Sequence, residues 1–302
     1  MSLLSDSGII VLEKPKGETS RKTLNRLQRL VRPVKVGHAG TLDPLAEGVL
    51  VACVGKATRL IDVIHLLPKQ YTATFLLGYT SDTEDIEGEL KPFVDGHVPT
   101  AAEFQAVLPR FLGKTRQRPP VYSALKIRGK RACDRTRDGE ILEIPPRWVE
   151  IFRLNILHYE YPRLSLEVEC GSGTYLRSLG RDLAEAVGTG AVMSVLVRDW
   201  IGPFRRQDAK TPDDLSDVAK ENWRNLLFPL EMAAGHLPRV DLNETDTTAI
   251  FHGQKISIPL PVGGEMSVGG ETPLAAFDPA QKLVSLLEPV EGNFYKPKVN
   301  FF

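Results

Sequence analysis

The sequence predicts an α+β protein with a mixed, mainly antiparallel sheet, flanking helices and a small β-rich domain at its C-terminal end. Strand-like and helix-like patterns are interspersed, and the strands come in pairs and not in regular βαβ units. Near residue 235 the composition changes, and glycines, prolines and short β-like runs follow. We therefore expect one large domain over residues 1–235 and a small one over 236–302.

The first half of the chain is expected to contain three strands, one helix and a turn-rich segment. Continuous or alternating apolar residues predict strands over 8–12, 50–54 and 71–77, and glycines and prolines predict turns over 37–50. Thr19 or Ser20 can cap a helix that Pro33 ends. The apolar stripe of this helix contains Leu24, Leu27, Leu30 and Val31.

The second half begins with an acidic loop over residues 80–100 and a helix over 101–112. A long basic segment with several prolines and glycines then appears irregular in sequence. The remaining patterns predict paired strands over 148–159 and 164–170, a helix over 174–187, an apolar run over 192–197 and a β-like run over 255–260.

Composition excludes several classes of protein. Hydrophobic residues make up 42% and charged residues 25% of the 302 residues, as in ordinary globular proteins. No apolar run approaches the roughly 20 residues that a membrane helix needs, and the N-terminus does not resemble a signal peptide. The three cysteines form no CxxC pair. We therefore expect a cytoplasmic protein without a disulfide framework.

The charge is balanced overall but unevenly distributed. The chain has 38 basic and 38 acidic residues. Residues 14–35 contain eight basic residues and one acidic residue, and residues 110–137 contain ten basic residues and one acidic residue. Two such segments can bind phosphates, although solvated basic faces explain them equally well.

The turn-rich segment contains a candidate catalytic carboxylate, Asp43. It lies between Leu42 and Leu45 in a loop that glycines and prolines constrain. A poorly hydrated carboxylate there could act as a nucleophile or a base. Alternatively, Asp43 only caps a turn, as many Asp-Pro pairs do.

A second candidate is Arg177, in the first turn of the helix predicted after Gly171. A cation at that position is disfavoured by the helix dipole, so we expect a carboxylate partner such as Asp43. Alternatively, Arg177 is exposed and packs its stem on Tyr175. The residues around it lack a complete nucleotide-binding pattern. Neither HExxH nor a cluster of His and Cys residues is present in the sequence, so we expect no metal site.

Five segments together resemble the TruB family of tRNA pseudouridine synthases. In chain order they are EKPKGETS, GHAGTLDPLAEGVLVACVGKATRL, KQYTATFLLGYTSDTEDIEGEL, RPPVYSALKIRGKRA and GSGTYLRSLGRDL. They appear in the family's order within roughly residues 8–204, which makes the resemblance specific. The C-terminal tail resembles the small PUA-like domain of bacterial members.

The resemblance implies a role for each matching residue. Asp43 corresponds to the family's catalytic aspartate, Arg177 to its arginine partner, and Tyr71 to a tyrosine that stacks on the base or removes a proton. Tyr175 and Leu196 correspond to residues that line the base pocket.

Further RNA contacts are implied in the same way. His38 corresponds to a residue that contacts the RNA loop, and Lys14 to one that supports the floor of the site. The basic stretch over 116–147, with Lys126 and Lys130, corresponds to a thumb that closes over the RNA. The chain departs from the family pattern at Glu47, Cys133, Val192 and Val197.

The resemblance implies isomerisation of uridine to pseudouridine at position 55, in the TΨC loop of tRNA. The uridine must leave its stack before a carboxylate can reach it. Asp43 could attack C1′ of the ribose or C6 of the ring, or assist elimination at C2′. The implied protein acts as a monomer on the T-arm, without a cofactor, a membrane or an obligatory protein partner. The alternatives are a guide-RNA-dependent synthase of the dyskerin type and a non-catalytic tRNA chaperone.

Overall fold

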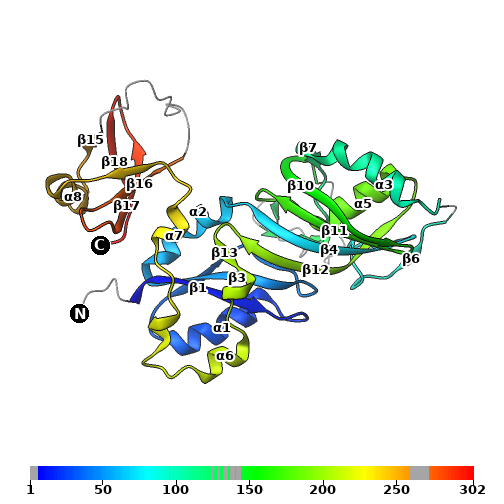
Figure 1. Ribbon diagram of the computed structural model, residues 1–302, viewed down its shortest axis with the longest axis horizontal. Helices are drawn as coiled ribbons and strands as arrows, with labels where there is room; N and C mark the ends of the chain where they lie inside the picture. Colours follow the sequence, from blue (N-terminus) through cyan, green and yellow to red (C-terminus); the bar gives the residue numbers. More distant parts are fainter. Residues whose placement is uncertain are drawn as a thin grey trace.

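The computed structural model describes residues 6–94, 96–123, 125–127, 130, 131, 135, 136, 140, 144–258 and 272–302. Their strands form a nine-stranded sheet, a five-stranded sheet and two pairs of short strands. Helices pack against the large sheet, and the five-stranded sheet lies at the C-terminal end of the chain (Figure 1). The α+β prediction is therefore confirmed.

The described elements of the first half include six strands that we did not expect, β2, β5, β6, β7, β8 and β9. In chain order the elements are β1 (Gly8–Lys14), α1 (Ser20–Val31), β2 (Val36–Ala39), β3 (Glu47–Val54), α2 (Ile61–Leu66), β4 (Lys69–Leu77), β5 (Tyr79–Thr80), β6 (Lys91–Pro92), α3 (Ala101–Val107), β7 (Gly113–Gln117), β8 (Lys126–Ile127) and β9 (Lys130–Arg131).

The second half supplies the remaining strands of the large sheet and all of the five-stranded sheet. Its described elements are β10 (Arg147–Glu160), β11 (Arg163–Cys170), α5 (Leu176–Ala186), β12 (Ala191–Ile201), β13 (Phe204–Arg205), α6 (Pro212–Asp217), α7 (Glu231–Ala234), β14 (Arg239–Asp241), α8 (Glu244–Phe251), β15 (Ile256–Ser257), β16 (Leu274–Phe277), β17 (Leu283–Pro289) and β18 (Phe294–Asn300).

The large sheet has the strand order β1-β3-β12-β4-β11-β10-β7, with β2 beside β3 and β13 beside β12. Among its described strands, β3 and β12 form the one parallel pair. The predicted pairing of β10 with β11 is confirmed and is antiparallel. Strand β12 pairs with both β3 and β4, and so joins two parts of the sheet that precede it in the chain by more than a hundred residues.

The local patterns explain the elements that surround the site. The side chain of Thr19, one of the two expected caps, accepts a hydrogen bond from the backbone N–H of Lys22 at the start of α1. Strand β4 alternates between buried and half-buried residues, as its sequence predicts. Tyr71 therefore points to the same side of the sheet as Phe75, into the core that α5 covers.

Two expectations need correction. The helix expected over residues 101–112 is α-helical only to Val107, and a 3₁₀ helix follows over Leu108–Phe111, where Pro109 cannot donate a hydrogen bond to the preceding turn. The turn-rich segment over 37–50 is partly extended, because β2 pairs along β3. The glycines and prolines predicted the turns correctly, but they also led us to miss the extended residues of β2 and the start of β3.

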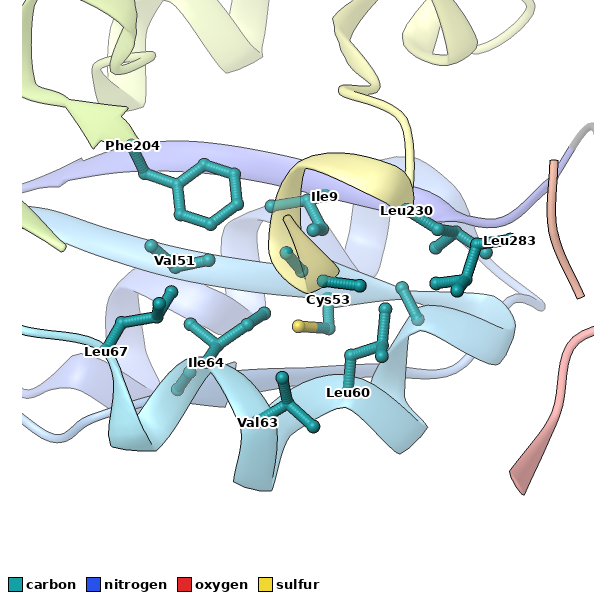
Figure 2. Packing of buried hydrophobic residues seen from close by; sticks show 14 of the residues in the cluster. Ile9, Val51, Cys53, Leu60, Val63, Ile64, Leu67, Phe204, Leu230 and Leu283 are labelled. Atoms are coloured by element: carbon teal, nitrogen blue, oxygen red, sulfur yellow. The ribbon is translucent and has the colours of Figure 1, made fainter. Parts of the chain in front are cut away.

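Apolar clusters hold the elements together. On one side of β1 and β3, Leu24 of α1 and Leu215 of α6 pack over Ile10 and Leu50. On the other side, residues of α2 and α7 pack over Ile9, Val51 and Cys53, as Figure 2 shows. The same cluster includes Leu283 of β17, so the five-stranded sheet packs against the large one through a shared apolar core.

Strand β12 approaches β3 so closely that one position requires glycine. Gly48 has a φ of +101°, and a Cβ atom there would lie 2.3 Å from the carbonyl oxygen of Arg198. Any side chain at Gly48 would push β12 away from the start of β3. The close approach therefore depends on this glycine.

Gly180→Ala should destabilise the fold by about 2 kcal/mol, although alanine favours helices. A Cβ atom at Gly180 of α5 would lie 2.0 Å from Cε1 of Phe75, which is fully buried. Urea denaturation of the variant measures the effect. Gly235→Ala is the matched control, because its Cβ would meet only a carbonyl oxygen 3.8 Å away. Equal unfolding midpoints for the two variants would contradict this packing.

The five-stranded sheet has the order β14-β16-β17-β18-β15 and its own apolar cluster with α8. The β-like run expected over 255–260 appears as β15, and residues 259 and 260 lie outside the described part. No helix within the described ranges has the length and apolar character that crossing a membrane requires.

Candidate active site

Asp43 lies in a loop between β2 and β3 that is tied to the start of α1. The hydroxyl of Ser20 donates a hydrogen bond to the carbonyl of Leu42 at 3.0 Å and accepts one from its backbone N–H at 2.9 Å. Both partners are buried. These bonds fix the backbone next to Asp43 without using its carboxylate.

Lys14 stabilises the backbone of the same loop. Its side chain is fully buried, and its ammonium group donates hydrogen bonds to the carbonyls of Pro15, Pro44 and Ala46. Burial lowers the pKa of Lys14 to about 8. Lys14 thus contacts the backbone of the loop but does not line the cavity beside Asp43.

Arg177, on the first turn of α5, is paired with Asp43. The distance from its Nη2 to Oδ2 of Asp43 is 2.9 Å, and that from its Nη1 to Oδ2 of Asp85 is 3.5 Å. It also donates to the carbonyls of Thr83 at 2.7 Å and Tyr122 at 3.0 Å. Four acceptors therefore hold this guanidinium in one orientation.

The two members of this pair differ in exposure from what the sequence suggested. The side chain of Arg177 is 7% exposed, and that of Asp43 is 41% exposed. We expected a shielded carboxylate, but the shielded partner is the arginine. The carboxylate of Asp43 is therefore accessible to a substrate, while the guanidinium of Arg177 is buried and held in place.

Tyr71 lies on β4, and Arg198 of β12 is opposite it in the sheet register. The side chain of Tyr71 is buried, and burial raises the pKa of its hydroxyl above the ordinary value. The hydroxyl of Tyr71 is therefore neutral near pH 7. Leu196 of β12 and Tyr175, which precedes α5, line a small cavity together with Tyr71 and Asp43.

The remaining expected RNA contacts lie away from Asp43 or outside the description. His38 is on β2 and is not among the residues that line the cavities beside Asp43. Burial lowers its pKa, and its Nδ1 atom has no hydrogen-bond partner in the described part of the chain. Lys126 and Lys130 lie on β8 and β9, but their side chains are outside the described set, as is Cys133.

Two site residues were missed by the sequence analysis. Asp85, the second partner of Arg177, is buried in the segment that we predicted only as an acidic loop. Arg198 is 1% exposed, and its guanidinium donates to the carbonyls of Val49 at 2.7 Å and Gly40 at 2.9 Å. In the sequence, the one sign of Arg198 was its position directly after the apolar run over 192–197, which forms part of β12.

Within the described residues, no group of three or more His, Cys, Asp and Glu side chains could hold a metal ion. The site therefore presents one exposed carboxylate, a buried arginine that pairs with it and a buried tyrosine. Such a set can stabilise an anionic nucleophile or a base next to an aromatic ring.

Two family models match adjacent parts of the chain. Residues 28–176 match the TruB family pseudouridylate synthase N-terminal domain, and residues 177–234 match the tRNA pseudouridylate synthase B C-terminal domain. Curated relatives agree with this result. A tRNA pseudouridine synthase B of Xanthomonas axonopodis pv. citri (strain 306) is 40% identical over 87% of this chain and 86% of that protein. One of Arthrobacter sp. (strain FB24) is 37% identical over 98% of this chain and 96% of that protein.

Solved structures share the fold. A crystal structure of a Cbf5-Nop10-Gar1 complex matches with a TM-score of 0.77 and 26% identity, over 100% of this chain and 88% of that one. A structure of an H/ACA RNP bound to a substrate RNA containing 2′-deoxyuridine matches with a TM-score of 0.73 and 24% identity, over 99% of this chain and 86% of that one.

The fold and the matched domains define an isomerase of the pseudouridine synthase class. Both halves of the TruB pattern are present in order, and a relative 40% identical spans most of the chain. The chain belongs to the TruB family of pseudouridylate synthases.

Proposed function

We propose that this protein converts uridine to pseudouridine at position 55, in the TΨC loop of tRNA. The observation that carries the proposal is the Asp43–Arg177 ion pair beside buried Tyr71. The relatives in Xanthomonas and Arthrobacter, whose names specify tRNA, support the choice of substrate. Asp43, Arg177 and Tyr71 act as the catalytic residues.

The target uridine must be flipped out of its stack before the reaction. A cavity of about 120 Å³ beside Asp43 suits the free base, because its lining combines apolar side chains with polar groups that can hydrogen-bond a base. The apolar lining residues are Leu42, Tyr71, Leu176, Met193 and Leu196. Tyr71 offers the aromatic face on which a base stacks.

In the reaction, the bond between N1 of the base and C1′ breaks, the base turns, and a bond between C5 and C1′ forms. The hydrogen on C5 leaves as a proton, and N1 ends with a proton, so the atoms balance without a co-reactant. Asp43, paired with Arg177, is the group that reaches the sugar or the ring. Attack at C1′, attack at C6 and assisted elimination at C2′ all begin from this arrangement.

The rate of a single turnover should not rise steeply between about pH 7 and pH 9, because burial raises the pKa of Tyr71 and keeps its hydroxyl protonated there. Tyr71 then serves through its ring and its neutral hydroxyl. Stopped assays at saturating RNA measure the rate. A rate that rises tenfold for each pH unit would show that the ionised tyrosine removes the proton.

The outer face of α1 offers phosphate contacts near the site. Lys22 and Arg29 are exposed on the helix, and Arg32 follows its last turn. Lys22 is paired with Glu18, whereas Arg29 and Arg32 have no carboxylate within 4.0 Å among the described residues. The start of α1 contacts the Asp43 loop, so this basic face can extend the RNA-binding surface.

Lys126→Ala with Lys130→Ala should weaken binding to all T-arm sequences alike, because both lysines belong to the proposed thumb over 116–147. Each lost phosphate contact should lower the slope of log affinity against log salt by about 0.7 to 0.9. Titrations at several salt concentrations measure the slope. Lys220→Ala with Lys282→Ala, two exposed positions elsewhere, is the matched control. Identical slopes for the two double variants would remove the thumb from the binding surface.

We also propose a division into a catalytic domain over 1–235 and a small PUA-like domain over 236–302. The five-stranded sheet, which begins at Arg239 and has its own core, supports that division. The proposed protein works as a monomer in the cytoplasm. Its two described cysteines, Cys53 and Cys170, are free and buried, as is usual in a reducing compartment.

The decisive test is tritium release from a T-arm stem-loop labelled at C5 of the target uridine, using the purified protein alone. Release is expected, since C5 loses its hydrogen when it bonds to C1′. A stem-loop with cytidine at the target position is the control. A guide-RNA-dependent synthase, the alternative that the solved neighbours keep open, would release none. A non-catalytic chaperone would bind the RNA and also release none.

A further inference from the structure

Two cavities meet at Asp43 and Tyr71 but differ in their lining. The smaller one, assigned above to the base, has Arg177 as the one cationic side chain among its described lining residues. The larger one, of about 310 Å³, is lined by four cationic side chains. Its cationic side chains are Lys69, Arg147, Arg177 and Arg198. If the base occupies the smaller cavity, the sugar and phosphate of the same nucleotide extend toward the more cationic one.

Two of these cations are buried without a carboxylate partner. The side chains of Lys69 and Arg198 are 5% and 1% exposed, respectively. Lys69 donates to the carbonyls of His65 and Leu67, both at 2.8 Å, and neither cation has an ion pair within the described residues. Burial and, to a smaller extent, the nearby charge of Arg198 lower the pKa of Lys69 to about 8.

Backbone carbonyls satisfy some donors of these two side chains but do not neutralise their charge. Buried charges in proteins are usually paired with an opposite charge. Among the described residues that line this cavity, Asp43 is the one carboxylate, and it is already bound to Arg177. The cavity therefore has an excess of positive charge.

The same cavity contains buried polar atoms that lack partners. The hydroxyl of Ser123, whose side chain is 4% exposed, and Nε of Arg147 have no hydrogen-bond partner among the described residues. Both residues line the cavity with Lys69 and Arg198. Buried polar atoms without partners need an explanation, and a ligand with several acceptor oxygens would satisfy both of them.

We propose that Lys69 and Arg198 bind a phosphodiester group next to the target uridine. Lys69 precedes Tyr71 by two residues on β4, so both side chains lie on one face, about 7 Å apart along the strand. Arg198 is opposite Tyr71 on β12. In this arrangement the base of the nucleotide contacts Tyr71, its sugar lies at Asp43, and its phosphate binds Lys69 and Arg198. The inference rests on the proposed function and adds a contact for the backbone of the flipped nucleotide.

The first experiment uses the wild-type protein and three T-arm stem-loops. Each carries one neutral methylphosphonate linkage: directly 5′ of the target uridine, directly 3′ of it, or in the stem as a control. One of the two flanking substitutions should weaken binding roughly tenfold, the loss expected for a charge-assisted contact. The stem substitution should change affinity much less. Equal affinity for all three RNAs would overturn the inference.

The second experiment adds Lys69→Met, which keeps the length of the side chain and removes its charge. This variant should bind the normal RNA more weakly, yet show little further loss on the sensitive methylphosphonate RNA. Lys56→Met is the matched control, since Lys56 also contacts a backbone carbonyl but lies outside the cavity. It should discriminate between the two RNAs as the wild type does.

Two outcomes would contradict the assignment without touching the proposed activity. If Lys69→Met loses affinity equally for charged and neutral linkages, the lysine is only structural. If the single-turnover rate falls while affinity stays constant, the cations act on the departing base and not on a phosphate. Failure of every RNA to release tritium with wild-type protein would instead refute the proposed function itself.

Discussion

Asp43→Asn is expected to reduce pseudouridine formation by at least ~10³-fold while RNA affinity stays within about tenfold of the wild type. Asparagine has the shape of aspartate but lacks the charge needed for nucleophilic or base chemistry. The loop should keep its conformation, because Ser20 and Lys14 hold its backbone without using the carboxylate. Tritium release and filter binding measure the two effects separately.

Asp217→Asn is the matched control for that experiment, because Asp217 is exposed on α6 and lies in no cavity described at the site. It should leave both turnover and affinity unchanged. Turnover near the wild-type rate in Asp43→Asn would show that this carboxylate only shapes the loop. That result would favour the alternative in which Asp43 only caps a turn.

Arg177→Met is expected to lower turnover strongly and to destabilise the fold by roughly 3 kcal/mol. The change removes the cation that pairs with Asp43 and leaves Asp85 buried without its partner. It also removes the donor for two backbone carbonyls. Arg177→Lys should recover part of the stability but little of the activity, because one ammonium cannot reach the four acceptors in the same geometry.

Arg181→Met separates catalysis from stability. Arg181 lies one turn further along α5 and pairs with Glu84 and Asp182, not with Asp43. Its loss should also lower the urea midpoint while turnover on the folded protein remains close to normal. If both arginine variants lose activity in proportion to their stability, Arg177 acts as a structural residue.

Local patterns in the sequence predict the elements that form within a short stretch of chain. Helix α1 follows from its cap and apolar stripe, and β4 from the alternation around Tyr71 and Phe75. The pairing of β10 with β11 follows from two adjacent β-like runs with a short connection. These elements depend on neighbouring residues, so a single sequence carries the information.

Long-range pairing could not be predicted in this way. Nothing local shows that β12 lies between β3 and β4, or that Arg198 is buried there without an acidic partner. Asp85 was hidden because it is one of six acids over residues 82–95 of the expected acidic loop. In the structure, its neighbours Glu84 and Ile86 form backbone hydrogen bonds with Met193 of β12. Lys69 could have been found by extending the alternation of β4 two residues toward its start.

The central position of β12 has a consequence for the order in which the protein is made. Until residues 191–201 have left the ribosome, β3 and β4 each lack a neighbouring strand on their inner edges. The nascent chain then carries Asp43 and Tyr71 on separate pieces of sheet with open backbone groups, which are prone to pair wrongly. Closing the sheet requires contacts across more than 140 residues, and such contacts form slowly. Synthesis of β12 is thus the moment at which both the sheet and the site become complete.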